Sequence, residues 1–302
     1  MGWIFEKVTR MAYLNINGTT MYCEVHGHGT PIVFVHDAMV DHRMWHAQVS
    51  AFSGRNRVIV YDLRGHGKTG PTQQSSYTVP LMTEDLLGLI DALNLHRPVL
   101  CGCSFGGMIV QQFALTHPEM ISGLILCDST LPMTLTLPDK VQASFFNWSM
   151  TPSVRLLGAQ RFTDYAFWLA RLMASEDEFG HDPQTRDYIR QCMRSIPTEE
   201  MIKIYRMILH FQPVDPREIG VPILRIDGHQ EPKNDNQQTP LLKQQVSSAR
   251  FEMLPTTGNS VNLKNPERFN AILEKFLSVL QDAAFLWKPA IPAQPGVPIR
   301  SN

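Results

Sequence analysis

The apolar positions of this chain form short uninterrupted runs, separated by longer segments in which apolar residues recur every three or four positions. Residues 31–36 read PIVFVH and residues 57–62 read RVIVYD. Continuous runs of this kind are typical of strands that are covered on both faces of a sheet. A first strand-like run begins at Ala12, and further strands are predicted at 98–103, 121–127, 222–227 and 250–254.

Helical periodicity separates these runs. Residues 79–95 place five apolar side chains on one helical face, and residues 104–116 and 266–280 also predict helices. An alternation of strands and helices predicts an α/β fold with a mostly parallel, doubly wound sheet.

The alternation stops between residues 131 and 218, where the chain holds helix-like segments rich in Phe, Trp and Met. The simplest interpretation is a helical lid over the carboxyl ends of the strands, where such sheets bind ligands. We therefore predict a core made of residues 1–130 and 219–284, a lid at 131–218, and an extended Pro-rich tail at 285–302.

Composition narrows the classes of partner. The chain has 302 residues, of which 43% are hydrophobic and 18% charged, and its formal net charge is −1. Because it has no run of Lys or Arg, we expect it to bind neither nucleic acid nor an anionic membrane. No stretch reaches the roughly 20 apolar residues that span a bilayer, so no membrane segment is expected.

The cysteines indicate the redox compartment of the protein, and the histidines indicate whether it binds a metal. The five cysteines, an odd number without a C-x-x-C pair, predict reduced thiols in a cytoplasmic protein. The histidines have no partners at ligand spacing, so we expect no metal and no cofactor. Nothing in the composition indicates an oligomeric state.

The main chemical signal lies at residues 102–107, which read GCSFGG and fit G-x-S-x-G. The motif follows a predicted strand and precedes a predicted helix. A sharp turn at such a junction needs small residues around the serine, and it lifts the hydroxyl towards the backbone N–H groups of the helix N-terminus. Ser104 is therefore predicted to be the reacting hydroxyl of an active site.

Three further segments carry a family resemblance. Residues 61–67 read YDLRGHG, residues 36–45 read HDAMVDHRMW, and residues 258–267 read GNSVNLKNPE. Together with the turn at residues 102–107, which corresponds to the family's nucleophile elbow, they make the chain similar to the α/β-hydrolase superfamily over about 11–280. The similarity is greatest to the small-molecule esterases and enol-lactonases of that superfamily.

The resemblance implies roles for several residues. The backbone N–H groups of Phe105 and Ala38 would hold an oxyanion beside Ser104. His36 would organise the loop that carries Ala38, and His66 would have a structural role in its own turn.

Two positions depart from the family pattern. Asn259 stands where the family has its general base, a histidine. An amide cannot accept a proton near neutral pH, so Ser104 would stay a weak nucleophile and acyl transfer would be slowed by orders of magnitude. Asp37 stands where the family usually has glycine. It is either a tolerated loop substitution or an acid or base that faces the pocket.

In this family a serine, a histidine and an acidic residue act together as a catalytic triad, and the chain has several candidates for the acidic residue. Glu231 aligns with the family's acid after the strand at 222–227, and Asp235 and Asp128 are alternatives. His229, in the same loop as Glu231, is a candidate substitute for the missing base.

Three hypotheses for function remain open. In the first, the chain is a hydrolase of a small ester, lactone or other carbonyl compound, and the catalytic base of the enzyme has been replaced. In the second, it is a non-hydrolytic enzyme, such as a lyase, cyclase or decarboxylase, that uses the same pocket. In the third, it is an inactive protein that binds a small molecule. The aromatic lid favours a hydrophobic or aromatic ligand. The residues expected to line the pocket are Asp37, His36, Cys103, Trp148 and Trp168.

Overall fold

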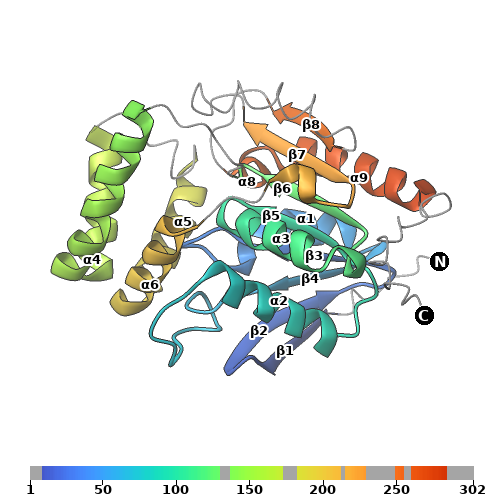
Figure 1. Ribbon diagram of the computed structural model, residues 1–302, viewed down its shortest axis with the longest axis horizontal. Helices are drawn as coiled ribbons and strands as arrows, with labels where there is room; N and C mark the ends of the chain where they lie inside the picture. Colours follow the sequence, from blue (N-terminus) through green and yellow to red (C-terminus); the bar gives the residue numbers. More distant parts are fainter. Residues whose placement is uncertain are drawn as a thin grey trace, which may run out of the picture.

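The fold is built around one mixed sheet. The computed structural model describes residues 9–129, 137–172, 182–211, 215–228, 249–254 and 260–283, and within them the sheet has eight strands (Figure 1). The strands are β1 (Thr9–Ile16), β2 (Thr19–His26), β3 (Thr30–Val35), β4 (Asn56–Tyr61), β5 (Val99–Cys103), β6 (Gly123–Cys127), β7 (Ile223–Gly228) and β8 (Ala249–Leu254). They lie in the order β1-β2-β4-β3-β5-β6-β7-β8. β2 is antiparallel to both of its neighbours, and the other pairs are parallel.

The six strands predicted after the first are β3 to β8, which confirms the predicted α/β fold with a mostly parallel sheet. Their bounds differ from the predicted ones by two residues at most. Every residue of β5 and of β6 is buried, because helices cover both faces of the sheet there. A strand buried on both faces has no reason to alternate polar and apolar residues, and this explains the uninterrupted runs.

The hairpin of β1 and β2 was not predicted beyond a strand-like start at Ala12. Its turn consists of Asn17 and Gly18, which have φ angles of 46° and 73°. An Asn-Gly pair at positive φ joins two antiparallel strands by a turn whose twist matches that of the strands. The Asn-Gly pair in the sequence was therefore a usable signal for this hairpin.

Two groups of helices cover the sheet (Figure 1). α2 (Val79–Ala92) packs beside α3 (Phe105–Thr116), and α1 (His46–Phe52) contacts α8 (Val261–Lys264) and α9 (Pro266–Ala283). α2 begins where the Thr78 side chain accepts a hydrogen bond from the Leu81 N–H. It ends three residues before the predicted end, because Asn94 has a φ of 48°, which a right-handed helix cannot accommodate.

The described part of the chain between β6 and β7 holds three α-helices. They are α4 (Leu137–Leu172), α5 (Pro183–Ser195) and α6 (Thr198–Leu209). Figure 1 shows them beyond the end of the sheet towards which the parallel strands point. α6 is tied to the core by the buried Glu200, which accepts a hydrogen bond from the Tyr77 hydroxyl and pairs with Lys203 at 2.5 Å. Lys203 also donates to the backbone oxygen of Gln74 at 3.0 Å.

Candidate active site

The predicted nucleophile elbow is the turn between β5 and α3. Ser104 has a φ of 47° and a ψ of −108°, a strained conformation for a residue with a side chain. Two hydrogen bonds hold its backbone: its N–H donates to the Cys127 oxygen at 2.7 Å, and its oxygen accepts from the Ser129 hydroxyl at 3.1 Å. The glycines at 102 and 106 leave no room for a Cβ, since one would lie within 2.4 Å of a neighbouring backbone oxygen. The turn leaves Ser104 partly exposed at the carboxyl edge of the sheet.

The loop after β3 lies beside this elbow. β3 and β5 are neighbours, with Val35 opposite Gly102, and the chain order reverses between them, which is where such sheets form ligand sites. His36 fixes the loop: its Nδ1 lies 2.7 Å from the Asp37 oxygen, and its Nε2 accepts a hydrogen bond from the Leu63 N–H at 2.9 Å. Complete burial lowers the pKa of His36, which keeps the ring neutral.

Asp37 occupies the centre of the site. Its Oδ1 accepts hydrogen bonds from the Ala38 N–H at 2.7 Å and from the Phe105 N–H at 3.0 Å. The Ser104 side chain lies beside the carboxyl group and favours its charged form. Burial raises the pKa of Asp37 above its ordinary value, although the two backbone hydrogen bonds and the Ser104 hydroxyl oppose the rise. The two backbone donors predicted for an oxyanion thus meet at one oxygen, which belongs to Asp37.

Asp128 lies at the end of β6, where its backbone has a φ of 44°. Its Oδ1 accepts from the Gly228 N–H at 3.1 Å, and its Oδ2 accepts from the Val261 N–H at 2.9 Å. The carboxylate therefore bridges the end of β7 and the start of α8, two residues after position 259. Glu231, Asp235, His229 and Asn259 lie outside the described residues.

Comparison with known proteins identifies the family. A family model described as the alpha/beta hydrolase fold matches residues 30–266. The chain belongs to this family. Among curated relatives, 3-oxoadipate enol-lactonase 1 of Acinetobacter baylyi is 24% identical, over 91% of this chain and 100% of that protein. The pimeloyl-[acyl-carrier protein] methyl ester esterase of Aeromonas hydrophila is 26% identical, over 83% of this chain and 96% of its own.

Solved structures agree with this assignment. The enol-lactonase from Burkholderia xenovorans has a TM-score of 0.71 and 26% identity, covering 88% of this chain and 99% of that one. A thermophilic esterase from Thermogutta terrifontis has a TM-score of 0.75 at 24% identity, covering 90% and 99%. The protein is thus an enzyme of the α/β-hydrolase family.

The structure gives the surroundings of three of the residues expected to line the pocket. Cys103 is completely buried below the elbow, and its Sγ lies 4.0 Å from Asn262 Oδ1. His36 is equally buried within its loop. Trp168 is 57% exposed and stacks on Tyr165. Helical spacing alone does not tell which face of α4 meets the core, so a role for these three residues in the pocket stays a prediction.

The remaining candidates are placed as follows. Asp37 is half-buried beside Ser104. Trp148 lies on α4, and its side chain is outside the described part of the structure. His66 is buried in the turn after β4, where its Nδ1 lies 3.0 Å from the Arg64 oxygen and burial lowers its pKa to about 3. A neutral, buried ring fits the structural role expected for His66.

Sequence reasoning missed a buried polar cluster beneath the loop that carries Asp37 and Ala38. His42 Nδ1 lies 2.7 Å from Asp62 Oδ1, and His42 Nε2 lies 3.2 Å from Glu24 Oε1. Asp41, His42 and Asp62 come close enough to hold a metal ion. However, both ring nitrogens of His42 already face carboxylates, and Asp41 pairs with Arg43 at 2.7 Å. We therefore interpret the cluster as support for the loop.

The His42 cluster predicts a pH-dependent stability. Burial alone would lower the pKa of His42, but Asp62 outweighs it through a hydrogen bond and its charge, with help from Asp41 and Glu24, so the pKa is raised. The stabilisation is complete below the ordinary histidine pKa of about 6.5 and is lost as pH rises through the raised value. His42→Asn should therefore cost about 1.5–3 kcal/mol at pH 6 and distinctly less at pH 9. Urea unfolding of both proteins at the two pH values measures this, and an equal cost at both would contradict it.

The loop is also held by α5, a contact between segments far apart in sequence. The Tyr188 hydroxyl donates to the Asp41 backbone oxygen at 3.0 Å, and the Arg43 guanidinium lies 5.2 Å from the centre of the Tyr188 ring. Cys192 Sγ donates to Asp41 Oδ2 at 3.4 Å. The loop that carries Asp37 is thus fixed by the core below and by α5 above.

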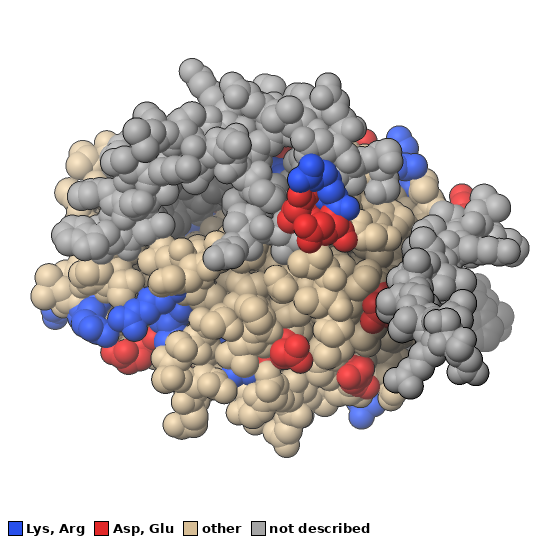
Figure 2. Space-filling model, viewed as in Figure 1, with Lys and Arg blue, Asp and Glu red and all other residues tan. Residues whose placement is uncertain are grey.

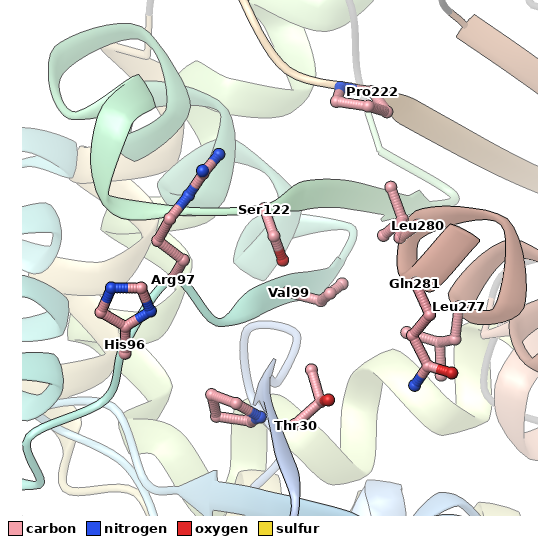
Figure 3. A pocket seen from close by; sticks show the side chains of 10 residues that line it. Thr30, His96, Arg97, Val99, Ser122, Pro222, Leu277, Leu280 and Gln281 are labelled. Atoms are coloured by element: carbon pink, nitrogen blue, oxygen red, sulfur yellow. The ribbon is translucent and has the colours of Figure 1, made fainter. Parts of the chain in front are cut away.

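A separate cavity of about 400 Å³ opens at the opposite edge of the sheet (Figure 3). Figure 3 shows His96 and Arg97 on one side of it and Leu277, Leu280 and Gln281 of α9 on the other. Arg97 is held by the backbone oxygen of Ile121, at 3.2 Å. The cavity lies at the amino ends of the strands, about 15 Å along β5 from Ser104, and so it is not the active site.

Among the described residues on the face that Figure 2 presents, charged side chains are scattered and of both signs. Among the described helices, none has both the length and the apolar character that crossing a bilayer requires.

Proposed function

We propose that this enzyme acts on a small hydrophobic carbonyl compound, an ester or a lactone, through the hydroxyl of Ser104. The observation that supports this proposal is the convergence of the Phe105 and Ala38 N–H groups on one oxygen position beside Ser104. Two preorganised donors at such a point stabilise charge on a reacting oxygen. Relatives named as an enol-lactonase and an ester esterase act on the same class of bond.

We assign the acid position to Asp128 in preference to Glu231. Asp128 is held by backbone N–H groups on both sides of the segment that contains position 259. In this role it would orient the side chain at 259, where a histidine would serve as base and Asn259 cannot.

The lid and the compartment complete the proposal. Residues 131–218, with α4, α5 and α6, would cover the carboxyl edge of a core formed by 1–130 and 219–284, and their aromatic side chains would favour a hydrophobic substrate. All five cysteines are buried and none of them forms a disulfide, which suits the reducing cytoplasm.

Asn259→His tests the assignment. A restored imidazole should raise the hydrolysis of p-nitrophenyl butyrate or dihydrocoumarin about 100-fold, the lower part of the range for a general base, because Asp37 still fills the oxyanion position. Adding Ser104→Ala to this variant should return the rate to that of the unmodified protein. The proposal fails if Asn259→His neither gains hydrolysis nor reacts with a fluorophosphonate at Ser104, as judged by mass spectrometry of the peptide.

A non-hydrolytic reaction is the second candidate, and the position of Asp37 favours it. A carboxylate between the two backbone donors opposes the build-up of negative charge on a substrate oxygen. An inactive binding protein is the outcome if no variant turns over any substrate.

A further inference from the structure

The Asp37 carboxylate occupies the position in which a substrate oxyanion would bind. Each of the two backbone donors is already used by Asp37 Oδ1, at 2.7 Å from Ala38 and 3.0 Å from Phe105. The carboxylate also lies at the N-terminus of α3, a helix of 12 residues whose dipole favours a negative charge there. A substrate oxyanion would have to displace a group that these contacts stabilise.

The loop gives Asp37 little freedom to leave. Its backbone N–H donates to Met44 Sδ at 3.3 Å, and its backbone oxygen lies 2.7 Å from His36 Nδ1. Farther along the same loop, Asp41 is bonded to Tyr188 of α5. The contacts of the loop therefore hold the Asp37 carboxylate in a fixed position in the site.

His36 cannot serve as the base instead of Asp37. Both of its ring nitrogens are engaged inside the loop, with the Asp37 oxygen and the Leu63 N–H, and the ring is fully buried. Asp37, in contrast, is half-buried, and its carboxyl group lies beside the Ser104 side chain.

We propose that Asp37 converts the oxyanion position of this site into a proton acceptor, so that the site takes the enol or hydroxyl group of an enolisable carbonyl compound. This inference rests on the proposed function for the location of the site. A carboxylate whose pKa is raised is a better base than an ordinary aspartate, which suits the role.

The reaction that follows is a proton transfer without an acyl-enzyme. Asp37 takes the proton of the enol O–H, and the electron pair of that bond forms the C=O bond. The π pair of the C=C bond takes a proton from the Ser104 hydroxyl at carbon. The protonated Asp37 then returns its proton to the neighbouring Ser104 oxygen. The net change is conversion of an enol into a ketone, and no group is consumed.

The first test removes the Asp37 carboxylate, so that the two backbone donors are free to bind a substrate oxyanion. In the Asn259→His background, Asp37→Gly removes the carboxylate and should raise ester hydrolysis a further 100-fold or more, the effect of regaining oxyanion donors. Asp37→Asn is the matched control, because its amide oxygen can keep both hydrogen bonds while the charge is lost, and it should gain less than tenfold. Thermal unfolding of each variant checks that it is folded.

The outcomes separate the two proposals. If Asn259→His alone is as fast as the double variant and both react with a fluorophosphonate at Ser104, the role of Asp37 is overturned and the proposed function stands. If neither variant hydrolyses an ester nor is labelled, the proposed function itself has failed.

A second test can be decided on the unmodified protein, with Asp37→Gly as its comparison. p-Nitrophenol is titrated with protein at the pH where half of the free phenol is ionised. The unmodified protein should bind the neutral phenol and weaken the phenolate absorbance, whereas Asp37→Gly should strengthen it. A rise in phenolate absorbance with the unmodified protein, or no change with it, would overturn the inference.

Discussion

Asp85→Ala should lower the free energy of unfolding by about 3–5 kcal/mol, because it leaves a buried guanidinium without its partner. Arg64 and Asp85 are both completely buried, and their closest atoms, Arg64 Nη2 and Asp85 Oδ1, are 2.5 Å apart. A second bond joins Arg64 Nε to Asp85 Oδ2 at 2.6 Å, and Asn17 Nδ2 donates to Asp85 Oδ1 at 3.0 Å. The pair joins α2 and the β1–β2 turn to the segment after β4. Denaturation in urea, followed by circular dichroism, measures the loss.

Two controls make the Asp85 prediction specific. Glu274→Ala breaks an ion pair with Arg55 of similar length, 2.8 Å, in which both side chains are more than half exposed. It should cost less than about 1 kcal/mol. Replacing both buried charges, Arg64→Met with Asp85→Leu, should recover much of the stability lost in the single variant. A cost for Asp85→Ala equal to that for Glu274→Ala would mean that Arg64 finds water or another partner.

The sequence predicted the parts of this fold that depend on local pattern. Burial on both faces produced the apolar runs of β3 to β6, and the elbow requires glycine where chains touch, so both could be found without coordinates. The Asn17-Gly18 turn was equally local and was overlooked.

The parts that were not predicted depend on contacts between distant segments. Tyr188 lies 147 positions from Asp41, and nothing near either residue in the sequence indicates their hydrogen bond. The exposure of Trp168 depends on which face of α4 meets its neighbours. Asp37 was noticed as an unusual residue, but its direction follows from the contacts of its loop with His36 and Met44.

Gly106→Ala should prevent the elbow from forming and should destabilise the protein by about 3 kcal/mol, the upper range for overpacking a well-packed site. A Cβ at Gly106 would lie 2.3 Å from the backbone oxygen of Val35 and 2.6 Å from that of His36. Neither oxygen can yield easily, because both belong to the strand end and loop that position Asp37. α3 would have to move away from β3, and the Phe105 N–H would then leave Asp37 Oδ1.

Two glycines elsewhere in the chain provide matched controls for Gly106→Ala. A Cβ at Gly54 or Gly220 would meet no atom within 4 Å, and neither residue has a positive φ. Gly54→Ala and Gly220→Ala should therefore change the free energy of unfolding by about 0.5 kcal/mol or less. If Gly106→Ala were as mild as these, β3 and α3 would be able to separate without loss of stability. The close contact that brings Asp37, Ser104 and Phe105 together would then not be a rigid feature of the site.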